Sequence, residues 1–292
     1  MRRPSRSTKL SVSSPSASSS LPHCKTRTVR RRLTVGGWRP ASNRRLSTHR
    51  ERPSSREADG TAVVQTAAVR EQGLLAAVAA SRRWYDDIFD LHRIEVGSDG
   101  ALWWAEDAPP RWHSAVKTLV PTTDPSGALL RMERHPHGTI ADSFGLLDLT
   151  SRGFDLLLAA TWLHHGCVAA TAPSLKWNRV LESDVMAAWN QHHDTVGVLP
   201  TDLWAHPRFT VLARHDGDDL TGGAILHDAG AVVGLSNTWS SEDGPVDPRV
   251  LLEIAAETHP GRAVVDYAWG SDLETMLGAG FEPLGPQHVW IR

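Results

Sequence analysis

The chain has 292 residues, of which 40 % are hydrophobic and 22 % are charged, a composition typical of a folded globular protein. It contains only two cysteines, Cys24 and Cys167, which excludes a disulfide framework or a cysteine-based zinc site and fits a cytoplasmic location. No run of 18 apolar residues occurs, so we expect no membrane span.

The net charge of −2 conceals a strong asymmetry along the chain. Residues 1–60 contain 15 basic and three acidic residues, a net charge of +12, whereas the remainder carries −14. The first 60 residues are also too poor in apolar side chains to offset the entropy of ordering, so we expect a disordered tail rich in Ser and Arg. A nucleic-acid-binding arm, a transit peptide and a dispensable tail all fit this composition, and we favour the last. The acidic remainder argues against nucleic acid as a partner of the folded part.

Order is expected to begin near Thr61, and residues 61–170 are predicted to form a small α+β region. Apolar residues at helical spacing predict a helix over 67–93. Two short apolar runs around the turn at 97–100 predict a hairpin. The other elements predicted here are a strand over 114–121, a short helix over 127–135, a strand over 138–144, and a strand or helix over 154–163.

Residues 171–292 show a clearer alternation of strands and helices. Three strands joined by tight polar turns are predicted over 208–239, and a helix begins at Pro248, a residue that the first helical turn tolerates. The remaining predicted elements are a strand over 175–180, helices over 182–193 and 200–207, a strand over 263–269, a helix over 271–280, and a closing pair of strands over 281–284 and 287–292.

This order of elements over 175–292 resembles that of the GNAT superfamily of acetyl-CoA-dependent N-acetyltransferases. The segment "LETMLGAGFEPLGPQHVW", with its Gly280-Phe281 step, is similar to the closing helix and final hairpin of that family. The resemblance implies an α/β (α+β) fold with a mixed sheet. In it, the strand over 231–239 bulges and splays away from the strand over 263–269.

The resemblance also implies a cofactor and a reaction. Acetyl-CoA, or another acyl-CoA, would lie in the opening between the two strands, near Gly234, Leu235, Ser236 and Asn237. A small-molecule or peptide amine would attack its thioester, which makes the protein a transferase. Residues 61–170 resemble the leading part of actinobacterial two-part GNAT-like proteins, and a degenerate second copy of the fold is a further interpretation of this region.

Two parts of the family pattern are missing. The loop over 240–248 contains one glycine, no Arg or Gln, and three carboxylates, which would repel a diphosphate. We expect this loop to cap the following helix with a carboxylate, which the helix dipole favours. The tyrosine that commonly protonates the leaving thiolate falls on Met276, which has no proton to donate. An active N-acyltransferase and a catalytically inactive ligand-binding or regulatory module therefore both remain open.

The candidate catalytic residues are Asp266 and Tyr267, near the end of the strand over 263–269. Alternation along a strand places their side chains on opposite faces, so at most one points into the opening. Ser236 and Asn237 either line the opening or form a strand bulge. The fifteen histidines include no pair at helical spacing with an intervening Glu, so no metal site is predicted.

Overall fold

The computed structural model describes residues 56–167, 176–241 and 245–292, with side chains from residue 67 onward. The expected disordered tail lies almost entirely outside these residues, and so do Glu242 and Asp243 of the acidic loop. The first helix, α1 (Arg56–Leu91), begins five residues before the expected start of order at Thr61. No helix in the described part of the chain is long and apolar enough to cross a membrane.

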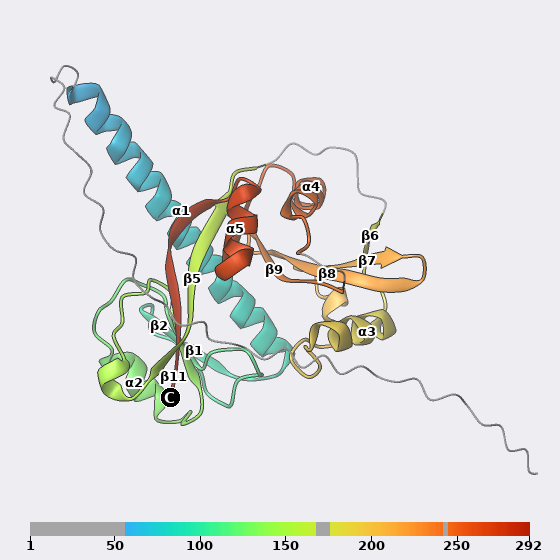
Figure 1. Ribbon diagram of the computed structural model, residues 1–292. Coiled ribbons are helices and arrows are strands. Elements are labelled where there is room, and N and C mark those ends of the chain that lie inside the picture. The colour runs from blue at the N-terminus through green and yellow to red at the C-terminus, as the bar shows by residue number, and fades with distance from the viewer. Residues whose placement is uncertain (1–55, 168–175, 242–244) are drawn as a thin grey trace, which may run out of the picture. The chain divides into compact units, whose positions relative to one another are not determined.

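The described residues form one mixed sheet of eleven strands with helices on both faces (Figure 1). Its strand order is β1-β2-β3-β4-β11-β5-β10-β9-β8-β7-β6. The strands are β1 (Val96–Ser98), β2 (Leu102–Ala105), β3 (Val116–Thr118), β4 (Thr139–Asp142), β5 (Asp155–His165), β6 (Trp177–Arg179), β7 (Phe209–Asp216), β8 (Asp219–Asp228), β9 (Val232–Ser240), β10 (Ala263–Ala268) and β11 (Glu282–Ile291). The other helices are α2 (Ser126–Met132), α3 (Ser183–His193), α4 (Pro248–Thr258) and α5 (Gly270–Gly278), with two short 3₁₀ turns at Thr150–Arg152 and Leu203–Ala205.

The two ends of the sheet have similar connectivity. In each, a helix crosses over between two parallel strands: α2 links β3 to β4, and α4 links β9 to β10. The strand that flanks each pair is distant in sequence, because β4 pairs with β11 and β10 pairs with β5. The long strands β5 and β11 pair with each other and join the two ends into one sheet.

The predicted closing hairpin over 281–292 is therefore wrong. These residues form the single strand β11, with an irregularity between Pro283 and Gly285 where the two strands were expected to separate. The strand continues because its pairing with β5 runs through Gly285 and Pro286, and its last four residues also pair with β4. The segment over 154–163, for which helix and strand both remained open, is the strand β5.

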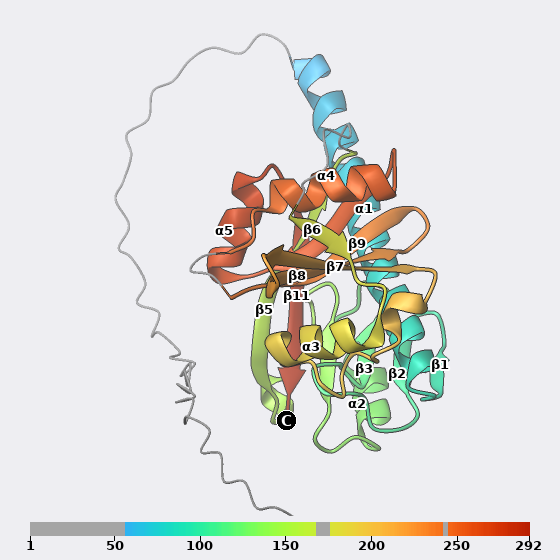
Figure 2. The ribbon, with the colours of Figure 1, turned by 90° about the vertical axis from the view of Figure 1, so that its right-hand side faces the viewer.

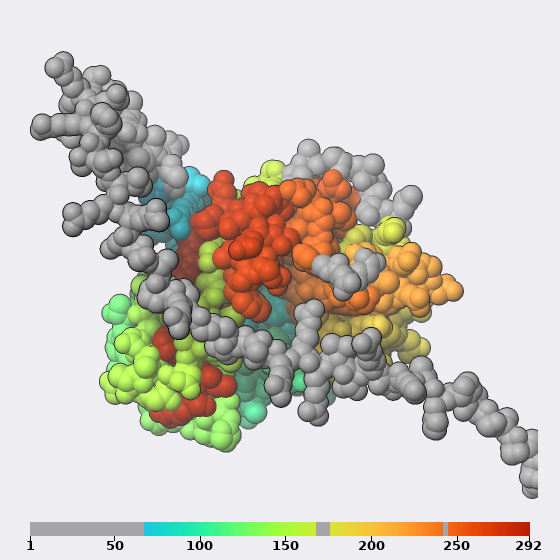
Figure 3. Space-filling view, viewed as in Figure 1, coloured from blue at the N-terminus to red at the C-terminus, as the bar shows by residue number. Residues whose placement is uncertain are grey.

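The core lies in two layers, one on each face of the sheet (Figure 2). On one face, α4 and α5 pack apolar residues such as Leu251 and Met276 against β9 and β10. In the space-filling view these two helices form neighbouring parts of one surface (Figure 3). On the opposite face, α1 crosses the sheet and packs against both ends of it, with Ile88 and Phe89 fully buried near β7 and β8.

An ion network fixes α1 to the sheet. Asp87 of α1 accepts hydrogen bonds from Arg208 and from His227 of β8, at 2.7 Å and 2.8 Å respectively. Because these partners stabilise its ionised form despite burial, the pKa of Asp87 lies well below its ordinary value. The helix is thereby held at one position over β8 and β9.

Candidate functional site

The parallel strands β9 and β10 diverge, as the resemblance implied. They pair over only three positions, the last of which joins Gly234 to Val265, although both strands continue beyond it. On its other edge β9 contains a bulge against β8 after Ser236, where Asn237 has a φ of +53°. The main-chain groups of β9 beyond Gly234 that face β10 thus have no strand partner among the described residues.

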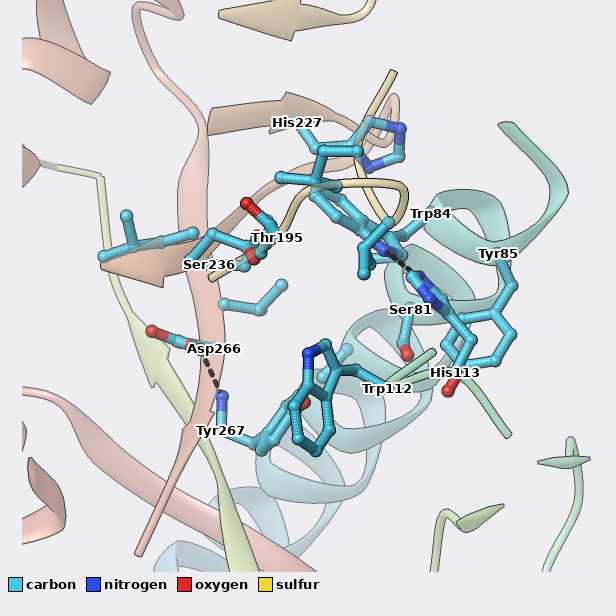
Figure 4. Close-up of a pocket in the computed structure, with 18 of the residues that line it drawn as sticks. Ser81, Trp84, Tyr85, Trp112, His113, Thr195, His227, Ser236, Asp266 and Tyr267 are labelled. Carbon is cyan, nitrogen blue, oxygen red and sulfur yellow. Dashed lines mark hydrogen bonds between the residues drawn. The ribbon is translucent and has the colours of Figure 1, made fainter. Parts of the chain in front are cut away.

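A cavity of about 360 Å³ opens at this divergence (Figure 4). It lies on the face of the sheet that α1 covers, and its walls come from segments far apart in the sequence. These are α1, the loop before β3, β5, the end of α3 with the residues that follow it, β8, β9 and β10. The volume falls at the lower end of the range typical of sites for small organic molecules.

Five large aromatic side chains form much of the cavity wall. Trp162 contacts Tyr267 edge to face with ring centroids 5.4 Å apart, and both rings line the space. Figure 4 shows Trp112 between Tyr267 and the residues of α1. The complete set of aromatic residues is Trp84, Tyr85, Trp112, Trp162 and Tyr267.

Three histidines also line the cavity, and they differ in what their ring nitrogens contact. Both ring nitrogens of His113 have hydrogen-bond partners, since Nε2 accepts a hydrogen bond from Trp84 Nε1 at 3.2 Å and Nδ1 faces the Arg111 carbonyl oxygen. Burial lowers the pKa of His113 to about 4, so it stays neutral. His227 is almost fully buried and bonded to Asp87.

His193 is the histidine best placed for chemistry. It is the last residue of α3, lies partly buried in the cavity wall, and is bonded to Asn237 at the bulge of β9. Burial lowers the pKa of His193, outweighing the effects of Asn237 and Asp194. Its imidazole is therefore neutral near pH 7 and able to accept a proton.

All six site residues predicted from the sequence line this one cavity: Gly234, Leu235, Ser236, Asn237, Asp266 and Tyr267. Gly234 has no side chain to narrow the cavity. The nearest atom to a Cβ placed at this position would be the Cβ of His227, at 3.8 Å. The Leu235 side chain packs into the core on the α4 side. Leu235 therefore contributes to the cavity mainly through its backbone.

Asp266 and Tyr267 point to opposite sides of β10. The Tyr267 ring packs on Trp162, whereas the Asp266 carboxyl group points away from these rings and accepts a hydrogen bond from the Tyr267 amide at 2.6 Å (Figure 4). Burial, with a smaller contribution from the charge of Asp272, raises the pKa of Asp266 well above its ordinary value. Loss of water around the hydroxyl group raises the pKa of Tyr267, although 37 % of the residue is exposed. Tyr267 therefore holds its proton at neutral pH, and burial favours the protonated form of Asp266.

The start of α4 is capped by the protein itself, as the carboxylates of the acidic loop predicted. Asp247 accepts a hydrogen bond from the Arg249 amide at 3.0 Å, in the place where an anionic ligand would otherwise accept it. The Arg249 guanidinium is itself bonded to the carbonyl of Gly278. Met276, at the expected tyrosine position of the closing helix, is buried in the core.

Sequence reasoning missed most of the cavity wall. No motif in the sequence singles out His193, and no local pattern connects Trp84, Trp112 and Trp162 to one another. The abundance of tryptophan, twelve residues against two tyrosines, was the one signal that indicated aromatic grooves. Within the described residues no group of three or more His, Cys, Asp or Glu side chains is arranged to hold a metal ion.

No family model and no curated protein sequence matches the chain. Among solved structures it is similar to a GCN5-related N-acetyltransferase from Kribbella flavida, with a TM-score of 0.50 and 12 % identity over 73 % of this chain and 95 % of that one. A putative GNAT acetyltransferase from Novosphingobium aromaticivorans has a TM-score of 0.46 and 12 % identity, over 70 % and 93 %. A tandem GNAT protein from the clavulanic acid biosynthesis pathway has a TM-score of 0.40 and 14 % identity, over 65 % and 78 %. The described part of the chain thus has the GNAT fold.

Proposed function

We propose that this GNAT-fold protein is an N-acyltransferase that moves an acyl group from acyl-CoA to an amine. The observation that carries the proposal is the divergence of β9 and β10 beyond Gly234, with a cavity open at that point. The unpaired main-chain groups of β9 suit the amide-rich pantetheine arm, and the cavity on the α1 side suits the acceptor. The fold alone does not assign this activity, because one fold supports many functions.

The side chains of the cavity can move both protons of the reaction. The neutral His193 imidazole takes a proton from the amine as its nitrogen attacks the thioester carbonyl carbon. When the carbon–sulfur bond breaks, the leaving thiolate takes the phenolic proton of Tyr267, which the elevated pKa retains until that moment. The products are an amide and the free thiol of CoA, and each side chain regains its resting state through solvent.

Asp266 has a positioning role in this proposal. Its carboxyl group points away from the rings of the cavity, and burial favours its protonated form, so His193 is the better candidate for the general base. Its hydrogen bond to the Tyr267 amide instead fixes the main chain next to the proton donor.

The experiment is acetyl transfer by the purified chain, measured as release of free CoA thiol with a panel of amines. We expect His193→Gln to lower kcat at pH 7 at least a hundredfold, because removal of a general base typically costs 10²–10⁴-fold. His192→Gln is the matched control, since His192 is the neighbouring residue but does not line the cavity. Equal activity of the two variants would exclude His193 as the base.

A second candidate function, a ligand-binding module without catalysis, is favoured by the start of α4. The Asp247 cap occupies an amide that a diphosphate would need, and Met276 replaces the usual proton donor. Loss of two or three charge-assisted hydrogen bonds would weaken acyl-CoA binding by roughly 3–9 kcal/mol. Calorimetric titration with acetyl-CoA separates the two candidates. Micromolar binding with transfer to an amine supports the enzyme, and no heat at millimolar acetyl-CoA leaves the binding module.

A further inference from the structure

The chemistry of the cavity wall restricts what can occupy it. Among the described residues that line the cavity, none is a lysine or an arginine. The wall offers instead five aromatic rings, three imidazoles and two acidic residues, Asp266 and Asp194, the second of which is paired with Arg111. Aromatic faces attract cations and flat apolar groups, and a site without basic side chains gives no counter-charge to an anion.

Trp112 is the most unusual member of this wall. Its backbone has a φ of +70°, in the left-handed region that a bulky residue rarely adopts, and 71 % of the residue is exposed. A strained backbone that holds a large apolar side chain in solvent at the edge of a cavity is typical of a functional position. Figure 4 shows the indole next to Tyr267 and facing the interior of the cavity.

The strained position of Trp112 is held from the opposite side of the cavity. The neighbouring Arg111 guanidinium stacks on the Trp112 ring at 4.8 Å and is bonded to Asp194 Oδ1 at 3.0 Å. Asp194 immediately follows His193, the proposed base, and also has a left-handed backbone, with a φ of +59°. One arginine therefore links Trp112 to Asp194, the residue next to His193.

We propose that the acceptor is a primary amine carried on an aromatic or similarly flat apolar body, with the ring bound against Trp112 and Trp84. This inference rests on the proposed function and specifies its substrate class. The ammonium group is drawn by the aromatic faces. It gives one proton to solvent, and the resulting neutral amine gives a second to His193 as its nitrogen attacks the thioester carbonyl carbon. Polyamines and sugars are poor occupants, because the rings offer too few hydrogen-bond partners to replace the water that these molecules would lose.

The test is calorimetric binding to the full chain in the absence of acyl-CoA, with three probes. These are 2-phenylethylamine, its charge-reversed analogue 3-phenylpropionate, and spermidine. We expect 2-phenylethylamine to bind at least tenfold more tightly than either of the others. Binding of the carboxylate or of the polyamine with equal or greater affinity overturns the proposal.

Variants of Trp112 test the site itself. We expect Trp112→Ala to weaken 2-phenylethylamine binding at least tenfold and Trp112→Phe to retain most of it, because the second variant keeps an aromatic face. Trp104→Phe is the control, since Trp104 lies on β2 and does not line the cavity. Unchanged binding by Trp112→Ala overturns the assignment.

The same measurements keep this inference separate from the proposed function. If 2-phenylethylamine binds but receives no acetyl group, the substrate chemistry of the cavity stands and the enzyme proposal fails. If acetyl transfer to spermidine is observed without binding of 2-phenylethylamine, the enzyme stands and the aromatic acceptor is excluded.

Discussion

Replacing Lys117 by methionine is expected to stabilise the protein at neutral and acidic pH. Lys117, on β3, is fully buried, and its Nζ has no hydrogen-bond partner among the residues that the structure describes. Its surroundings are the rings of Tyr85 and Trp162, at 5.0 Å and 5.7 Å. Cation–π contacts of this kind return only part of the hydration energy that a buried ammonium loses.

The magnitude follows from the pKa of the lysine. Burial lowers the pKa of Lys117 from 10.5 to about 7, while the unfolded chain keeps the ordinary value. Between these two values the unfolded state binds one more proton than the folded state, so the stability of the wild type rises with pH. Each pH unit in this window contributes about 1.4 kcal/mol, and the full cost of the charged lysine below pH 7 approaches about 5 kcal/mol.

The assay is urea unfolding of the wild type and Lys117→Met at pH 7 and pH 9. We expect the variant to be more stable at pH 7 and this advantage to shrink by about 2–3 kcal/mol at pH 9, two pH units into the window. Lys176→Met, at an exposed position, serves as the control and should show no such difference. A constant difference between wild type and Lys117→Met at both pH values would refute the argument, because it would mean that the folded-state lysine keeps its proton.

Three further predictions concern the network under α1, the packing of β8 and the strained loop. Asp87→Asn should lower the free energy of unfolding at pH 7 by about 3 kcal/mol, because Arg208 loses its counter-charge and His227 loses a charged hydrogen-bond partner. This loss should begin to shrink below about pH 4, where the carboxyl group of the unfolded chain binds a proton, and should vanish only when the pH reaches the much lower pKa of the folded state. The exposed Asp90→Asn is the control, in urea unfolding at pH 7 and at acidic pH. Gly223→Ala should lower the free energy of unfolding by about 1–3 kcal/mol, because its Cβ would lie 2.2 Å from Trp189 Nε1. Gly278→Ala is the control and should not destabilise the protein, because its Cβ would meet nothing within 4 Å. Comparable melting temperatures for the two variants would contradict this prediction. Trp112→Gly should raise the free energy of unfolding by about 1 kcal/mol, because glycine adopts the positive φ at this position without strain, and the variant should no longer bind the amine. A fall in melting temperature would show instead that the packing of the indole stabilises the protein more than the backbone strain destabilises it.

The sequence predicted those elements whose signals are local. The helix over 67–93 and the three strands over 208–239 follow from periodic apolar residues and from turn residues such as Gly217 and Gly230, both of which have positive φ. The Asp247 cap was foreseeable for the same reason, because a cap acts within one helical turn.

The parts that escaped prediction depend on contacts between distant residues. Asp87 and His227 are 140 positions apart, and nothing near either residue indicates that they bond. Residues 281–292 were predicted to form a hairpin because Gly285 and Pro286 suggest a turn, whereas pairing of these two residues with the distant strand β5 keeps them extended. The cavity was placed correctly at the divergence of β9 and β10, but the wall that α1 and the Trp112 loop contribute could not be foreseen.

The position of β11 also sets the order in which the protein can be completed during synthesis. The ten residues of β11 lie between β4 and β5, so a nascent chain that has left the ribosome only as far as α5 still has a vacant central place in its sheet. Such a chain has two unpaired strand edges, which are sites for association with other chains. Final assembly must therefore await synthesis of β11, and deletion of its ten residues should harm the fold more than the loss of an outer strand such as β6.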